Sequence, residues 1–154
     1  MKKNQGFSLV ELIVVIAIMA VLVGVLAPAY LRYVEKSRKS TDVSSISDIL
    51  AAAEKVAIDP EFDLAAGAKF KLSGKGTLSM TVTDGSDAAG DALKEWKAIA
   101  GDGYTCKSKE FKKVDMSFEG ELLATGSVKW TISAADLVKF SPDFAKKWNT
   151  TSGS

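Results

Sequence analysis

Apolar residues are concentrated near the start of the chain. Twenty consecutive residues, from Leu12 to Leu31, carry no charged side chain. A helix of about 20 apolar residues is long enough to cross the hydrocarbon core of a lipid bilayer. The pattern therefore predicts a transmembrane helix over residues 7–31. A short basic segment, residues 1–6 with the sequence MKKNQG, precedes it.

A helical period continues beyond the uncharged run. Apolar residues recur at steps of three and four: Ile46, Ile49, Leu50, Ala53, Val56 and Ala57. Charged residues fall largely off this stripe and are expected on the exposed face: Arg32, Lys36, Arg38, Lys39, Asp42, Asp48 and Glu54. The pattern predicts an amphipathic helix over residues 32–58. One helix is therefore expected from Phe7 to about Ile58, because the residue before Pro60 disfavours the α conformation.

The remaining residues, 59–154, have the mixed pattern of a small α+β head. Residues 77–83 alternate apolar and hydroxyl side chains, which predicts a half-buried strand. Asp84-Gly85 is a turn signal, and Ser86 or Asp87 is expected to cap a helix that runs to about Ala100. The inner face of this helix is expected to carry Leu93, Trp96 and Ile99.

Two later segments, residues 111–118 and 127–132, also alternate in the manner of strands, with a turn expected at Glu119-Gly120. An antiparallel sheet of three or more strands follows from these patterns. Ser133 is expected to cap a last helix over residues 134–139, and Pro142 either ends it or starts a second short turn. Residues 149–154 read as a polar tail.

Three ordinary interpretations of the apolar run stay open beside any specialised one. The first is a secretory signal peptide cleaved near Ala27-Pro28-Ala29, the second is an unprocessed single-span anchor, and the third is the core helix of a soluble protein. The carboxylate of Glu11 and the length of the run weigh against the signal peptide. Basic residues lie on both sides of the span, so the charge rule does not set its orientation.

Glu11 is the unusual residue of this segment. A carboxylate near the start of an apolar helix is expensive in lipid, and such residues are usually paired and functional. A cut after Gly6 would place a new α-amine, that of Phe7, one helical turn from Glu11. Amine and carboxylate on neighbouring copies would then neutralise each other and specify the register of packed helices. The alternative is that Glu11 lies in the headgroup region.

The segment GFSLVEL, followed by the uncharged span, resembles the N-terminal signal of the type IV pilin and pseudopilin superfamily. The match covers about residues 1–40, including Pro28 and Tyr30. The resemblance implies that a prepilin peptidase cuts between Gly6 and Phe7 and that the Phe7 amine is methylated. It also implies that Glu11 acts in assembly.

The family resemblance also predicts the location of the chain and its assembly. The precursor is expected in the cytoplasmic membrane as a single-pass protein with its head outside. It would then assemble with other copies of itself, through pilus machinery, into a surface filament. The implied fold is a long helix, with a transmembrane half and an amphipathic half, packed on a small antiparallel-sheet head.

One position departs from the family pattern. Many pilins carry glycine where this chain has Ala20, and their helix unwinds between that glycine and the proline. Here Gly24 is the nearest glycine, and Pro28 lacks the N–H that would bond the Gly24 carbonyl. Gly24 and Pro28 therefore mark a weak point of the helix, or a modest permanent kink of the kind transmembrane helices tolerate.

The head carries no recognisable catalytic pattern. The chain has no His, so an enzyme is not expected, nor a metal or a cofactor. Asp84, Asp87 and Asp91 fit a capped helix start better than a calcium site, because no EF-hand spacing follows. The lysines at positions 107, 109, 112 and 113 fit a solvated loop and strand edge better than a site for DNA or a surface polymer.

The remaining special side chains are expected in the core. Trp96, Trp130 and Trp148 are predicted to fill it rather than to grip a ligand. The single Cys106 cannot form an internal disulfide and is expected as a buried thiol. Many Gram-negative pilins close a C-terminal loop with a disulfide. The lack of an internal disulfide in this chain therefore favours a Gram-positive pilin, a disulfide-free Gram-negative one, or a pseudopilin.

The sequence thus predicts a structural filament subunit, with two alternatives. One is a minor pilin or adhesin whose head binds DNA or surfaces. The other is a pseudopilin of type II secretion or competence. No calcium-loop pattern of the major secretion pseudopilins is evident near the C-terminus, which mildly favours a pilin.

Overall fold

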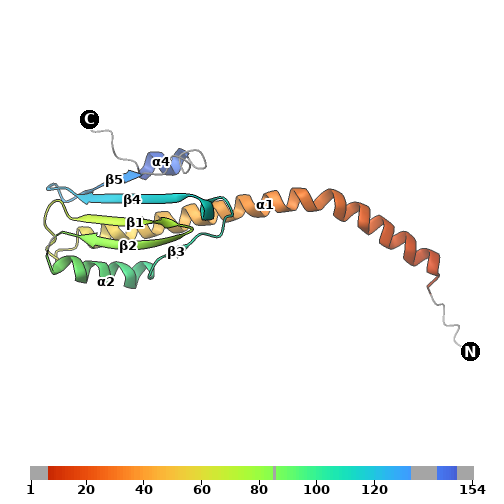
Figure 1. The fold of residues 1–154 in the computed structure, drawn as a ribbon, viewed down its shortest axis with the longest axis horizontal. Helices are drawn as coiled ribbons and strands as arrows, with labels where there is room; N and C mark the ends of the chain where they lie inside the picture. Colours follow the sequence, from red (N-terminus) through yellow and green to blue (C-terminus); the bar gives the residue numbers. More distant parts are fainter. Residues whose placement is uncertain (1–6, 85, 133–141, 149–154) are drawn as a thin grey trace, which may run out of the picture. The chain divides into compact units, whose positions relative to one another are not determined.

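The computed structural model describes residues 7–84, 86–132 and 142–148. The chain divides into two compact units, Met1–Ser37 and Arg38–Ser154. Helix α1, Leu9–Ala57, contains 49 residues and runs through both units, as Figure 1 shows. The prediction of one long helix over about residues 7–58 is confirmed. Its last turn closes with the amide of Ile58 donating to the carbonyl of Glu54 at 3.3 Å.

The first unit is the N-terminal part of α1. Every residue from Phe7 to Tyr33 is exposed, although most of them are apolar. By length and composition α1 is the one described helix that qualifies as a membrane span. An apolar surface that is not buried by its own chain must be covered by lipid or by other protein.

The second unit, the head, is built on a five-stranded antiparallel sheet. Its strands are β1 (Lys69–Lys75), β2 (Thr77–Thr83), β3 (Tyr104–Thr105), β4 (Asp115–Leu122) and β5 (Val128–Ile132). Their order across the sheet is β3-β2-β1-β4-β5. In β2 every second residue is buried, so only one face of the sheet is covered.

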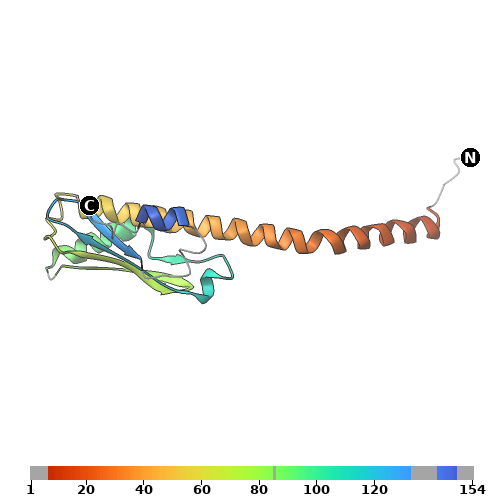
Figure 2. The same cartoon turned by 90° about the horizontal axis from the view of Figure 1, so that it is seen from above.

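Helices cover that face of the sheet. They are the second part of α1 (Arg38–Ala57), α2 (Ala88–Ala100) and α4 (Pro142–Trp148), as Figures 1 and 2 together show. The core between the two layers includes Ile46, Leu50, Phe70, Leu72 and Phe118, each fully buried. A short 3-10 helix, η1 (Phe111–Lys113), precedes β4. The α+β class and the long N-terminal helix agree with the sequence prediction.

The predicted strands are partly confirmed. β2 coincides with the predicted strand over residues 77–83, and β5 begins one residue after the predicted start at position 127. β1 and β3 were not predicted. The strand predicted over residues 111–118 is wrong in its first part, because residues 111–113 form η1 instead. The hydroxyl oxygen of Ser108 accepts the amides of Glu110 and Phe111, which turns the chain there.

The turn predicted at Glu119-Gly120 is also wrong. Both residues lie inside β4, and the chain reverses between Leu123 and Ser127 instead. A Cβ at Gly120 would lie 2.9 Å from ring atoms of Trp130, so glycine leaves room for the indole on the neighbouring strand. Glycine here serves packing, and the turn signal it gives in the sequence is misleading.

The details of α2 differ from the prediction. Asp87 is its N-cap residue but makes no capping hydrogen bond through its side chain, and the hydroxyl of Ser86 donates to Asp84. Trp96 is buried as expected, but Ile99 is 52% exposed, and two alanines, Ala89 and Ala92, complete the buried face. The helix predicted over residues 134–139 and the tail lie outside the described residues. Pro142 starts α4, as one of the two alternatives proposed.

Candidate functional site

The start of α1 carries the residues singled out in the sequence. Phe7 is 94% exposed, and Gly6 lies outside the described residues. One carboxylate oxygen of Glu11 accepts the backbone amide of Ser8 at 2.9 Å. Ser8 is the residue before the first helical residue, and its carbonyl accepts the amide of Leu12 at 3.2 Å. This bond is one half of a capping box, the half in which a Glu in the first turn satisfies the amide of the capping residue.

Glu11 therefore has a local partner in its own chain, a role that the sequence analysis did not consider. The spacing Ser8-x-x-Glu11 is the signal that would have indicated it. Glu11 is exposed, and its carboxylate lies at the positive end of the helix dipole. The capping bond fixes where this charge sits relative to the chain start.

An apolar surface follows directly after this polar start. Five side chains line a shallow hollow of about 370 Å³ on α1: Val14, Ala17, Ile18, Val21 and Leu22. Ala17 is the smallest of these five side chains, and the other four are branched. Such surfaces allow helices to pack closely through dispersion contacts.

α1 is helical through the segment predicted to be weak. The carbonyl of Gly24 has no amide to accept at Pro28, and the side chain of Arg32 approaches the carbonyl of Pro28 at 3.4 Å. A Cβ at Gly24 would meet nothing within 4 Å. Whether the helix unwinds here in an assembled state stays a prediction.

Three tryptophans fasten the second part of α1 to the head. The indole N–H of Trp96 donates to the carbonyl of Ile49 at 2.9 Å. Those of Trp130 and Trp148 donate to the side chains of Glu54 at 2.9 Å and Ser47 at 3.1 Å. The three rings come from α2, β5 and α4 and are buried, so the expectation that they fill the core is confirmed. Their N–H groups also fix the position of α1 on the sheet.

Asp42 is the main correction to the sequence analysis, which placed it on the exposed face. The residue is 0% exposed. Its carboxylate accepts the hydroxyl of Tyr104 at 2.6 Å and the backbone amides of Lys107 and Ser108, each at 2.8 Å. A buried carboxylate is tolerated when hydrogen bonds replace its lost hydration. Asp42 thus anchors the segment between β3 and η1 to α1.

Two acidic groups beside this anchor have raised pKa values. Burial, followed by the hydrogen bond to Asp42, raises the pKa of Tyr104 from 10.0 to about 12. Burial, followed by the charge of Asp42, raises the pKa of the Cys106 thiol from 9.0 to about 11. Cys106 is a free, buried thiol, as expected from the sequence.

These shifts predict how the head responds to alkali. The unfolded chain loses both protons at lower pH than the folded chain, so stability falls as the pH rises above about 9. We expect the free energy of unfolding to drop by about 2 kcal/mol between pH 8 and pH 10.5, from urea titrations followed by tryptophan fluorescence. A Cys106→Ala variant should lose clearly less over the same interval. Equal losses in both chains would contradict the assignment to the buried thiol.

The lysine cluster and Asp84, which the sequence offered as candidate binding residues, have ordinary structural positions in the head. The lysines at positions 107, 109, 112 and 113 are exposed, and they lie in the loop before η1 and in η1 itself, not on a strand. Asp84 accepts the amide and the hydroxyl of Ser86. Within the described residues no group of three or more His, Cys, Asp or Glu side chains is placed to hold a metal ion.

The comparisons with known proteins agree with this arrangement. A family model described as the prokaryotic N-terminal methylation motif matches residues 1–27. A fimbrial protein of Pseudomonas aeruginosa is 29% identical over 99 residues, which is 56% of this chain and 64% of that relative, so the chain spans just under two thirds of its length. The type IV major pilin protein PilE of Neisseria gonorrhoeae is 30% identical over 133 residues, 82% of this chain and 72% of PilE. No solved structure matches the chain.

An exposed apolar N-terminal helix followed by a small five-stranded antiparallel sheet is the α+β architecture of type IV pilin-like proteins. The similarity to PilE extends over most of both chains, through the head as well as the helix. The chain therefore belongs to the type IV pilin family.

Proposed function

We propose that the chain is the structural subunit of a type IV pilus or pilus-like surface filament. The observation that carries this proposal is the uninterrupted exposure of the apolar first part of α1. Burying such a surface contributes roughly 25 cal/mol for each Å² removed from water, so it cannot stay solvated. A membrane supplies the cover before assembly, and other copies of the helix supply it in a filament.

The proposed organisation of the chain follows the sequence prediction. Residues 1–6 are a leader that a prepilin peptidase removes between Gly6 and Phe7, and the new amine is methylated. Residues 7–31 anchor the stored subunit, with its head outside, and later form the filament core. Residues 32–58 are the amphipathic part of the helix, and 59–154 form the head. The exposed position of Phe7 and the match to the methylation motif support this processing.

The proposed assembly contact pairs Glu11 of one copy with the Phe7 amine of a neighbour. The capping bond supports this role because it holds the exposed carboxylate beside the chain start. An amine and a carboxylate buried in a wrong register would both lose their hydration without gaining a partner. The pair would therefore select one axial offset between otherwise uniform apolar helices.

The decisive experiment determines the N-terminus of the protein sheared from the surface of its native host. We expect a chain that begins at Phe7, with the mass of one added methyl group, as the dominant protein of the sheared filaments. A chain that begins at Met1 or at Tyr30 would overturn the proposal. A chain that begins at Phe7 but is scarce in the filaments would favour a minor pilin or a pseudopilin instead.

A further inference from the structure

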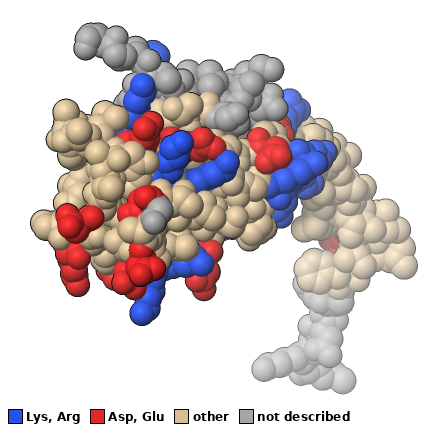
Figure 3. Space-filling view, turned by 60° about the vertical axis from the view of Figure 1, so that its left-hand side comes forward, with Lys and Arg blue, Asp and Glu red and all other residues tan. Residues whose placement is uncertain are grey.

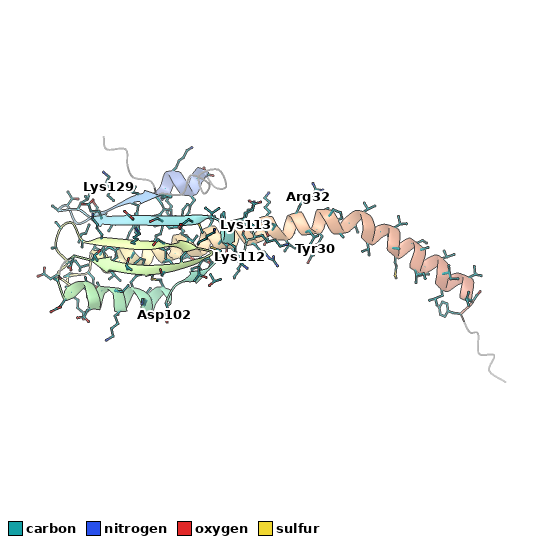
Figure 4. The ribbon with its side chains drawn as sticks, in the orientation of Figure 1. Tyr30, Arg32, Asp102, Lys112, Lys113 and Lys129 are labelled. Carbon is teal, nitrogen blue, oxygen red and sulfur yellow. The ribbon has the colours of Figure 1, made fainter. Side chains whose placement is uncertain are left out.

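One end of the head is strongly basic. Four exposed lysines, which we call the lysine end, lie within seven residues: Lys107, Lys109, Lys112 and Lys113. Figure 4 shows Lys112 and Lys113 at the end of the sheet where β4 begins. The acidic residue among them, Glu110, forms an ion pair with Lys39 near the point where α1 enters the head. The lysine end therefore keeps a positive excess.

The backbone that carries these lysines is fixed in place. Asp42 binds the amides of Lys107 and Ser108, and the Ser108 hydroxyl binds the amides of Glu110 and Phe111. Phe111 is buried beneath η1. The charges are therefore presented on a rigid base, and less order must be created when a partner binds.

The opposite end of the head carries an acidic segment, although Lys69 and Lys129 also lie at this end of the sheet. Where α1 ends, residues 58–68 contain Asp59, Glu61 and Asp63 and no basic residue. α2 begins beside this segment. A hollow of about 420 Å³ between them, which we call the acidic hollow, is lined by Asp59, Glu61, Phe62, Asp91, Lys94, Glu95 and Ala98. In Figure 3 acidic side chains are frequent at the lower left of the head, with some basic ones among them.

The charges and the shape of the acidic hollow suit a lysine side chain. Four carboxylates and one ammonium group line it, which leaves a negative excess, and Phe62 and Ala98 supply apolar surface. Lysine binds in this manner, with its methylene stem on apolar surface and its ammonium group among carboxylates. A polar rim around a partly apolar centre is also the usual composition of a protein interface.

The two ends lie at opposite ends of the same helix segment. Asp42, near the start of the second part of α1, holds the lysine end, and the acidic hollow follows the end of α1 at Ala57. Copies stacked in one direction therefore bring the lysine end of one head against the acidic hollow of another. A contact between two different patches of identical subunits builds an open filament when the rotation between successive copies does not close into a ring.

We propose that the lysine end of one head docks in the acidic hollow of the next copy along the filament. This inference rests on the proposed function, and it assigns to the heads a directional contact that the apolar helices do not provide. Like charges would meet if a copy were inserted in the reverse direction, so the contact also opposes wrong orientations. The occupant of each surface is therefore a second copy of this chain.

The test reverses the charges at each end of the full-length chain in its native host. The variant Lys112→Glu with Lys113→Glu should lower the yield of sheared filaments at least about fivefold, because it sets carboxylates against carboxylates. Glu61→Lys with Asp91→Lys should lower it similarly from the other side. Combining all four substitutions should restore the yield to within about twofold of the parent chain, since opposite charges face each other again.

The controls separate this inference from the proposed function. Lys146→Glu with Lys147→Glu makes the same charge change on α4, outside the lysine end and the acidic hollow; it also removes the contact of the Lys147 ammonium with the Trp148 ring, and it should leave the yield unchanged. The milder Lys112→Gln with Lys113→Gln covers the case in which charge reversal prevents folding. Normal filaments from the reversed variants would overturn the docking contact while leaving the filament role intact. Loss without rescue in the fourfold variant would also overturn it and assign the lysines to another anionic partner, such as a lipid surface or a nucleic acid.

Discussion

Replacing Asp42 with alanine is expected to lower the free energy of unfolding of the head by about 3 kcal/mol. The substitution removes three hydrogen bonds to one buried carboxylate at once, from Tyr104, Lys107 and Ser108. Hydrogen bonds to charged groups contribute about 1.5–3 kcal/mol each, but three bonds to one group are not additive. Donors left without a partner add to the loss unless water enters the site.

The measurement is urea unfolding of the detergent-solubilised chain, followed by tryptophan fluorescence, because all three tryptophans lie in the head. Asp48→Ala is the matched control, since Asp48 is an exposed aspartate on the same helix. It should change the stability by less than about 0.5 kcal/mol. Tyr104→Phe removes one of the three bonds and should cost about 1 kcal/mol. An Asp42→Ala loss no larger than that of Asp48→Ala would refute the anchor.

Asp42 also shows where reading the sequence fails. Its position, four residues before Ile46, continues the buried stripe of α1, so the helical period alone would have placed it inside. The residue type led to the opposite prediction, because aspartate is rarely buried without partners. Its partners lie more than 60 residues away, in β3 and the loop that follows, and nothing local in the sequence indicates them.

The contrast between local patterns and distant partners also explains which of the other structural predictions were right and which were wrong. The apolar run and the long helix depend on local periods, which the sequence displays directly. β3 has two residues, too few to show any alternation, and its pairing with Thr77 and Leu78 of β2 is non-local. Gly120 was predicted to form a turn. Its actual role is to leave room for the ring of Trp130 on the neighbouring strand, and only the fold shows this. The capping role of Glu11 was in the sequence but was overlooked.

Substitution of Glu11 is expected to have the largest functional effect. Both Glu11→Ala and Glu11→Gln should lower the yield of sheared filaments at least about tenfold, while processed chain persists in the membrane. Leaving one member of a buried ion pair without its partner costs about 3–5 kcal/mol at each contact, and 1.4 kcal/mol is already a factor of ten. Here the unpaired member would be the Phe7 amine of a neighbouring copy. Comparing the sheared and membrane fractions by immunoblot measures both quantities.

The pair of variants separates the two roles of Glu11, because glutamine also forms a capping box. Glu11→Gln keeps an oxygen that can accept the amide of Ser8 and loses only the charge, whereas Glu11→Ala loses both. If Glu11→Gln assembles normally while Glu11→Ala fails, the residue acts by ordering the helix start, and the ion pair with Phe7 must be abandoned. Glu121→Gln, which removes an exposed carboxylate from β4, is the control for charge loss elsewhere and should assemble normally. If both Glu11 variants fail to assemble while Glu121→Gln assembles normally, then the charge of Glu11, held in place by the capping bond, directs assembly.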